Sequence, residues 1–101
     1  RIADYVDRHY ADPDLSIDAL SAIFKISPSY LSRIFKREKG TGVLPYLQNK
    51  RITQAMVLLG TTNLKIREVA LQVGYLSDQT FARTFKSVTG STPSAYREKR
   101  K

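Results

Sequence analysis

The chain has 101 residues, which fits one domain or two very small ones, and its 42% hydrophobic and 26% charged residues predict a packed core rather than disorder. It has no cysteine and a single histidine, His9, so disulfides, thiol catalysis and a zinc or iron centre are excluded, and we expect neither metal nor cofactor. No apolar run approaches the roughly 20 residues needed to cross a bilayer, and the amino end does not resemble a signal peptide. The expected location is therefore the cytoplasm, without membrane contact.

The charge is unevenly distributed along the chain. Basic residues outnumber acidic ones by 17 to 9, which gives a net charge of +8. Residues 1–24 carry a net charge of −3, from two basic and five acidic side chains, whereas residues 25–101 carry +11, from fifteen basic and four acidic ones. Such an excess of positive charge in one part of a small domain is typical of proteins that bind a polyanion. We expect the acidic residues to face away from that partner.

Apolar residues recur at helical spacing throughout, and no alternating strand pattern occurs, so the sequence predicts an all-α fold of about seven helices. The first helix covers residues 2–10 and ends before Pro13, because a proline disfavours helical geometry in the residue that precedes it. A short helix follows over residues 16–24, and its first serine is a typical N-cap. The third helix covers residues 28–39, because Ser27 followed by proline is a strong start signal and a glycine follows its end.

The fourth predicted helix is the longest, from residue 43 to residue 59, with a proline tolerated in its first turn and Gly60 as its terminator. Arg51 lies near its apolar stripe, so we expect this side chain either to extend along the apolar surface or to bridge the two halves of the molecule. The predicted apolar face consists of Leu44, Leu47, Ala55, Leu58 and Leu59.

Three more helices are predicted in the last third of the chain. After a polar turn, a short helix covers residues 66–73. A helix over residues 78–89 starts at the N-cap Ser77 and ends at a glycine. A Thr-Pro pair opens the last helix, which runs through Arg97, and the basic tail 99–101 is expected to fray.

An internal repeat relates the two halves of the chain. A shift of 49 aligns the segment before each turn, so Leu76 is a one-residue insertion in the second turn. The repeated unit is a short helix, a turn and a longer capped helix, which is a helix-turn-helix unit. A shift of 50 pairs identical residues over the longer helix and beyond: Ser27, Arg33, Phe35, Lys36, Gly40 and Tyr46 with Ser77, Arg83, Phe85, Lys86, Gly90 and Tyr96. We interpret the two repeated tyrosines as packing residues.

The longer helix of each unit presents side chains that suit the major groove of DNA. At 100° per residue, a buried stripe in each helix leaves Ser29, Ser32, Arg33 and Lys36 facing outward in the first, and Gln79, Ala82, Arg83 and Lys86 in the second. Arginine binds guanine, glutamine binds adenine, and lysine neutralises phosphate. A single exposed arginine is usually only a solvated surface charge, but the recurrence of Arg and Lys 50 residues apart favours the functional interpretation.

Two segments resemble the DNA-binding domain of AraC/XylS-type bacterial transcription regulators. They are residues 27–36, SPSYLSRIFK, and the run from Gly74 to Arg97 that contains GY, RTFK and GSTPSAYR. The resemblance covers the chain from about Ile2 to Arg97 and implies two helix-turn-helix subdomains, 1–42 and 61–101, joined by a linker helix, 43–60. It also implies that two recognition helices, about 28–39 and 78–89, enter adjacent major grooves of one asymmetric site.

The resemblance assigns roles to individual residues. The implied base contacts are Ser29, Ser32, Arg33, Asp78, Gln79, Ala82 and Arg83, and the expected phosphate contacts are Lys36, Arg37, Asn49, Lys50 and Lys86. Asp78 either favours the helix N-terminus electrostatically or accepts from a cytosine amino group. Lys65 departs from the family pattern, because a capping serine is usual there. The expected partners are operator or promoter DNA, RNA polymerase, and a sensing or dimerisation domain that preceded Arg1 in a longer protein.

Two other binding functions fit the charge. An architectural or RNA-binding domain would show no sequence preference and would expose aromatic side chains for stacking, whereas the aromatic residues here fall on buried stripes. A module that binds an acidic protein would not need two regularly spaced Arg/Lys faces. An enzyme is not expected, because no histidine, cysteine or glycine-rich phosphate loop lies at catalytic spacing.

Overall fold

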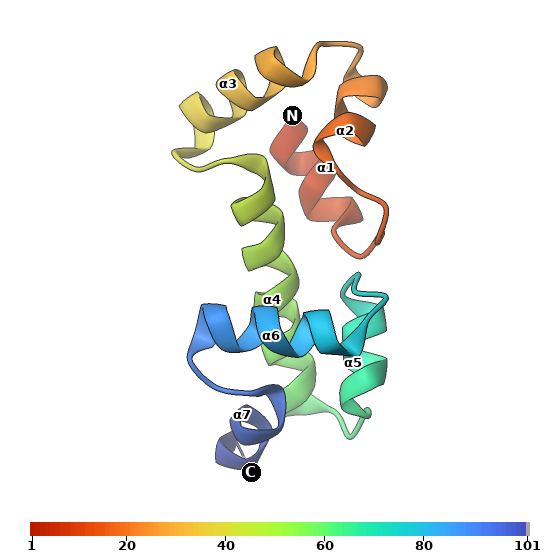
Figure 1. Ribbon diagram of the computed structural model, residues 1–101, viewed down its shortest axis with the longest axis vertical. Helices are drawn as coiled ribbons and strands as arrows, with labels where there is room; N and C mark the ends of the chain where they lie inside the picture. Colours follow the sequence, from red (N-terminus) through yellow and green to blue (C-terminus); the bar gives the residue numbers. More distant parts are fainter. Residues whose placement is uncertain (101) are drawn as a thin grey trace.

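A computed structural model describes residues 1–100, and within them the fold is all-α, as predicted. The molecule is elongated, with extents of 44 × 22 × 21 Å (Figure 1). None of its helices in the described residues is both long and apolar enough to cross a membrane. The seven helices found there are α1 Ile2–His9, α2 Ile17–Phe24, α3 Pro28–Lys39, α4 Val43–Thr61, α5 Ile66–Gln72, α6 Asp78–Thr89 and α7 Pro93–Arg100.

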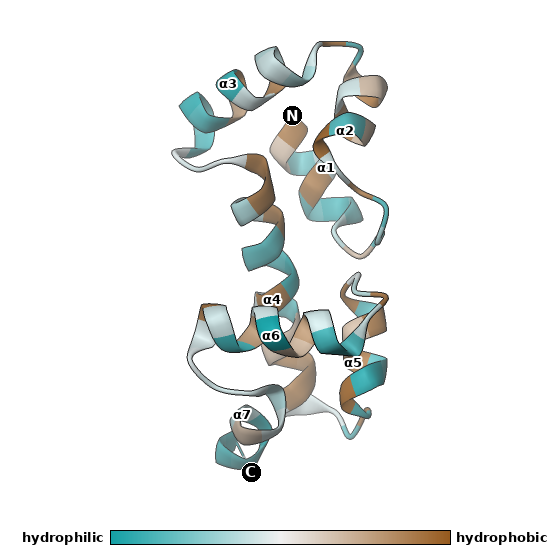
Figure 2. Ribbon diagram, in the orientation of Figure 1, coloured by the Kyte–Doolittle hydropathy of each residue, from teal (hydrophilic) through white to brown (hydrophobic). Residues whose placement is uncertain are grey.

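Two hydrophobic clusters lie at opposite ends of α4. The first cluster is built from α1, α2, α3 and the first turns of α4, and the second from the later turns of α4 with α5 and α6. Figure 2 shows that α4 is hydrophobic toward both ends and hydrophilic between them. The half-buried Tyr10, directly after α1, packs against both clusters. Each cluster therefore holds one helix-turn-helix unit, and α4 belongs to both.

The buried residues of α4 face in two directions. Val43 and Leu47 enter the first cluster, whereas Ile52, Ala55 and Leu59 enter the second. At 100° per residue, these two sets are centred roughly 130° apart around the helix axis. The predicted single apolar face was therefore wrong in part: Leu44 is 54% exposed and Leu58 is only half-buried. A helix shared by two cores does not need one continuous stripe.

The turns of the two units are equivalent, which confirms the repeat. The Ile26 amide donates to the Ser21 carbonyl at 3.2 Å, and 49 residues later the Tyr75 amide donates to the Ala70 carbonyl at 2.8 Å. The residue before each donor is left-handed, with φ of 59° at Lys25 and 108° at Gly74. Leu76, the predicted insertion, is 75% exposed. The extra residue is thus accommodated at the surface without disturbing the second core.

Several predicted helix ends were wrong. Gly60 lies inside α4, which continues to Thr61, because the Thr61 and Thr62 hydroxyls donate to carbonyls one turn earlier. Lys65 has no side-chain acceptor, yet α5 is partly capped because the Lys65 amide donates to Glu68 Oε1 at 2.7 Å. Of the tail expected to fray, Lys99 and Arg100 belong to α7, and the Arg100 guanidinium carbon lies 5.7 Å from the Tyr96 ring centre. Lys101 lies outside the described residues.

Arg51 bridges the two units, which confirms one of the two roles expected for it from the sequence. Its Nε donates to the Tyr10 carbonyl at 2.7 Å and its Nη2 to the Asp12 carbonyl at 2.8 Å, and both acceptors lie in the segment after α1. The guanidinium carbon also lies 5.4 Å from the ring centre of Tyr75, in the turn between α5 and α6. The two units therefore meet around one side chain of α4.

Gly74 is buried at this junction and cannot be replaced without strain. Its φ of 108° is unfavourable for any L-residue with a side chain, and an added Cβ would lie 2.7 Å from Arg51 Nε and 2.8 Å from the Tyr10 carbonyl oxygen. We expect Gly74→Ala to lower the free energy of unfolding by more than about 2 kcal/mol, because backbone strain and steric overlap add. Chemical denaturation at equilibrium measures this.

Gly90→Ala is the matched control. Gly90 also has a positive φ, of 86°, but open space surrounds its added Cβ, so only the backbone strain remains, about 1 kcal/mol. Equal losses for the two variants would contradict the close packing described at Gly74.

Candidate nucleic-acid interface

The helix α3, predicted from the sequence to be a recognition helix, is fixed at both ends and along its buried side. The Ser27 hydroxyl oxygen accepts from the Tyr30 amide at 3.1 Å, and a proline occupies the first turn. Gly40 ends the helix in the left-handed conformation, with φ of 77°. Leu31 and Phe35 are buried in the first cluster. These constraints determine which side of α3 faces solvent.

The helix α6, the second predicted recognition helix, has the same kinds of N-cap, C-cap and buried residues as α3. The Ser77 hydroxyl oxygen accepts from the Thr80 amide at 3.2 Å, and Gly90 ends the helix. Phe81 and Phe85 are fully buried. Asp78 occupies the first turn, where a carboxylate interacts favourably with the helix dipole.

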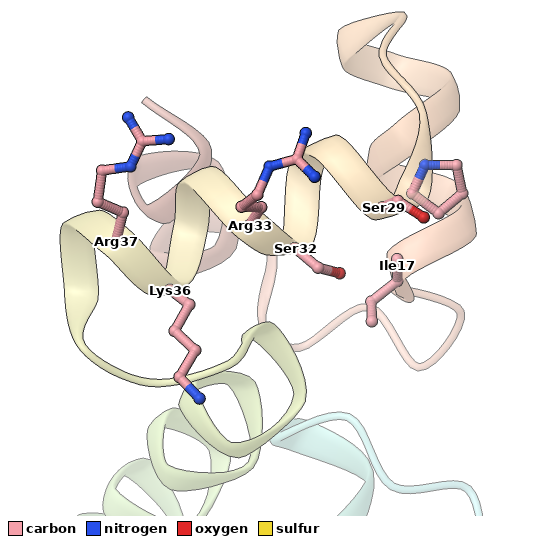
Figure 3. Close-up of a pocket in the computed structure, with 7 residues that line it drawn as sticks. Ile17, Ser29, Ser32, Arg33, Lys36 and Arg37 are labelled. Carbon is pink, nitrogen blue, oxygen red and sulfur yellow. The ribbon is translucent and has the colours of Figure 1, made fainter.

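The outward side of α3 brings together five of the residues predicted to contact DNA. Figure 3 shows them around one open surface groove, with Ile17 of α2 at its edge. Ser32 is half-buried, and the other four predicted residues in the groove are exposed: Ser29, Arg33, Lys36 and Arg37. Ile17 was not predicted as a site residue. The groove therefore combines two hydroxyls and three cations with an apolar edge.

The outward side of α6 carries the second predicted set. Ala82 is half-buried, and the rest of that set is exposed: Asp78, Gln79, Arg83 and Lys86. In Figure 1, α3 and α6 run in the same direction across the long axis, each with its amino end toward the right of the view. The two helices thus occupy equivalent positions in the two helix-turn-helix units.

On the buried sides of α3 and α6, a phenylalanine of each helix packs against the repeated tyrosine. Phe35 and Tyr46 meet edge to face with ring centres 5.2 Å apart, and Phe85 and Tyr96 do the same at 5.6 Å. This confirms the interpretation of both tyrosines as packing residues. Burial, with a bond donated by the Tyr46 hydroxyl to Asp7 Oδ1 at 2.8 Å, raises the pKa of Tyr46. Tyr30 is the exception among the aromatic residues expected to be buried, because it is 46% exposed.

Within the described residues, no carboxylate lies within ion-pair distance of the cations on α3 and α6. Across residues 1–100, the one ion pair within 4.0 Å joins the Arg1 amino group to Asp4. The Arg33 guanidinium instead lies near an aromatic face, with its carbon 5.6 Å from the Tyr30 ring centre. The same part of the chain contains no cluster of three metal-ligating side chains. The surface chemistry is therefore that of free cations and hydrogen-bond donors.

Two predicted phosphate contacts lie elsewhere. Asn49 and Lys50, in the hydrophilic middle of α4, line a separate depression with Asp7, Tyr46 and Thr53. Lys50 is half-buried, and its Nζ lies 5.9 Å from the Tyr10 ring centre. The structure therefore does not bring these two residues together with the group on α3.

Arg97 has a structural role that the sequence pattern did not reveal. Its Nε donates to the Leu59 carbonyl at 3.1 Å, and its two terminal nitrogens donate to the carbonyls of Leu64 at 2.6 Å and Thr62 at 3.3 Å. These contacts satisfy carbonyl groups at and beyond the end of α4 and attach α7 to the second unit. Only its place in the GSTPSAYR run distinguishes Arg97 from the other basic residues near the carboxyl end.

Known proteins are similar to this chain in both sequence and fold. Residues 20–99 match the helix-turn-helix domain family. The chain is 38% identical over 93 residues to the arabinose operon regulatory protein of Escherichia coli (strain K12), which covers 92% of the chain and 32% of that relative. It is 39% identical over 97 residues to an HTH-type transcriptional regulator of Staphylococcus aureus, covering 96% of the chain and 13% of that relative. The chain thus spans a third or less of these relatives.

Solved structures agree with this relationship. The C-terminal domain of AraT, a response regulator from Geobacillus stearothermophilus, is 35% identical with a TM-score of 0.97, over 99% of this chain and 83% of that one. The DNA-binding domain of AdpA, a global transcriptional factor solved in complex with a target DNA, is 28% identical with a TM-score of 0.89, over 96% of this chain and 86% of that one. The chain belongs to the AraC/XylS family and is the helix-turn-helix DNA-binding domain of a transcriptional regulator, not an enzyme.

Proposed function

We propose that one copy of this domain reads an asymmetric duplex site by placing α3 and α6 in adjacent major grooves. The observation that carries the proposal is the repetition of one exposed arginine, Arg33 and Arg83, at the same position of two equivalent helices that run in the same direction. Major grooves on one face of B-DNA recur about every 34 Å. The 19 residues of α4 span about 28 Å at 1.5 Å per residue, so the separation fits once the packed helices at either end are included.

The side chains suit direct reading of base edges. Arg33 and Arg83 would each donate two hydrogen bonds to a guanine, and Gln79 would pair with an adenine. The two serines on α3 would accept or donate according to the base they meet, and Ala82 would contact a thymine methyl group. The proposed base contacts are Ser29, Ser32, Arg33, Asp78, Gln79, Ala82 and Arg83, and the proposed phosphate contacts are Lys36, Arg37, Asn49, Lys50 and Lys86.

Three of the proposed contact residues, Asp78, Asn49 and Lys50, have more specific roles in the proposal. The carboxylate of Asp78 stabilises the start of α6 and, if it contacts a base, accepts from a cytosine amino group. Asn49 and Lys50 would contact the backbone between the two grooves, and the aromatic contact of Lys50 would have to loosen for its amine to reach a phosphate.

The greater length of the relatives suggests a role for the domain within a larger regulator. Since the chain spans about a third of the arabinose operon regulatory protein, we propose that it works beside a sensing or dimerisation domain and contacts RNA polymerase at promoters. A promoter-binding bacterial regulator would do this in the cytoplasm.

Binding should depend steeply on salt. The net charge of +11 on residues 25–101 supports about 6 to 10 phosphate contacts, each of which adds about −0.9 to the slope of log K against log salt concentration. Fluorescence anisotropy with labelled duplex measures the slope. Lys36→Ala should reduce its magnitude by about one, whereas Arg8→Ala, on the acidic first helix, should leave it unchanged. A flat response to salt would remove the electrostatic basis of the proposal.

The two repeated arginines should determine specificity. Arg33→Ala and Arg83→Ala should each weaken binding to a selected site by about 1–3 kcal/mol and relax the preference at one base pair. Lys36→Ala should weaken binding to all sequences alike, because a phosphate contact carries no sequence information. Competition with cognate and random duplexes distinguishes the two effects. An equal loss on both duplexes for Arg33→Ala would identify Arg33 as a phosphate contact and refute its assignment.

The two halves of the DNA site should differ in sequence selectivity. Gln79 and Arg83 of α6 form bidentate base contacts, whereas α3 offers one arginine and two short serines. We therefore expect the half-site under α6 to tolerate fewer substitutions, as measured by changing every base pair of a selected site in turn. Greater tolerance under α6 than under α3 would refute this order.

A further inference from the structure

The two helix-turn-helix units contact each other through loops beside the middle of α4, and Arg51 lies within this contact. Its two hydrogen bonds reach the segment after α1, in the first unit, while its guanidinium faces the Tyr75 ring in the turn of the second unit. Figure 1 shows the loop after α1 next to the loop between α5 and α6. Pro13 of the first loop lines the same depression as residues 74–77 of the second. The contact therefore joins segments that are about 60 residues apart in sequence.

The contact is tightly packed as well as hydrogen-bonded. Gly74 is buried, and an added Cβ there would lie within 3 Å of both Arg51 and the Tyr10 backbone, so the two loops approach as closely as a glycine allows. Burial lowers the pKa of Arg51, but an arginine remains protonated at neutral pH. Hydrogen bonds from a charged guanidinium are stronger than those from neutral donors, and their planar geometry constrains direction.

The middle of α4 needs such a constraint. Between Leu47, which is buried in the first cluster, and Ile52, which is buried in the second, four successive residues belong to neither hydrophobic core. Without the contact at Arg51, the two units would be held relative to each other at this stretch by the α4 backbone and by the half-buried Tyr10, which packs against both clusters and would then lack a directional bond to α4. Small bends or twists there would change the relative position of α3 and α6.

We propose that Arg51 is a positioning residue that sets the spacing between the two half-sites the domain accepts. This rests on the proposed function, in which α3 and α6 read adjacent grooves of one duplex. Inserting one base pair between the half-sites moves the second by about 3.4 Å and rotates it by about 35°. A domain whose units are held by Arg51 cannot follow that change, whereas a domain freed at the middle of α4 can.

The test compares binding to a selected site with binding to the same site carrying one inserted base pair. The wild-type domain should bind the inserted site at least about tenfold more weakly, because one half-site is lost. Arg51→Met removes the charge and the donors but keeps an unbranched stem, and it should reduce this penalty to about threefold or less. Arg8→Met, with the same change in net charge on the exposed face of α1, should keep the wild-type penalty.

The outcomes separate this proposal from the one it rests on. An unchanged spacing penalty in Arg51→Met overturns the role of Arg51 and leaves the two-groove function intact. Failure of the wild-type domain to select any duplex sequence overturns the two-groove function, and the spacing role with it.

A second measurement needs no variant and no DNA. Residual dipolar couplings of the wild-type domain in solution should fit a single alignment tensor for both helix-turn-helix units, because Arg51 holds them as one body. Tensors of different magnitude for the two units would overturn the proposal even if Arg51→Met does not fold.

Discussion

One helix supplies buried residues to two separate cores, and this constraint organises the whole domain. The faces of α4 that enter the two clusters differ by roughly 130° around its axis, so its length and twist determine where the two units stand. Neither unit can turn about α4 without exposing Ile52 and its neighbours or Val43 and Leu47. Arg51 adds a lateral contact between the units beside Tyr10, which packs against both clusters, at the stretch where the residues of α4 belong to neither core.

The repeat explains how two equivalent units can present different side chains on the outward faces of α3 and α6. The capping serines, the terminating glycines and the supporting phenylalanine and tyrosine pairs recur in both units, so α3 and α6 are held in the same way. The outward residues recur only in part: the arginine and lysine are repeated, whereas the serines of α3 become Gln79 and Ala82 in α6. The structural residues are thus repeated, whereas the residues proposed to face bases differ, and this difference favours the proposed asymmetric site over a palindromic one.

The local features of the fold were predictable, and the long-range ones were not. Ser27, Ser77 and the glycines after α3 and α6 act within one turn of chain, so their sequence context was enough to predict where both helices begin and end. The end of α4 was missed because two kinds of bond were not anticipated: those from the Thr61 and Thr62 hydroxyls to carbonyls one turn earlier, and one from Arg97 to the Leu59 carbonyl, 38 residues away in sequence. For Arg51, the sequence indicated a bridge but not its acceptors, since backbone carbonyls leave no signal in side-chain patterns. The roles proposed for the outward residues remain predictions.

In the proposed function, a single copy of the domain bridges two adjacent major grooves. Selection of binding sites from random duplex DNA, followed by determination of the number of chains bound to the selected site, tests it directly. We expect a non-palindromic site with two dissimilar blocks, centred about 10 to 10.5 base pairs apart and bound by one chain. A palindromic site that requires two copies of the chain would contradict it.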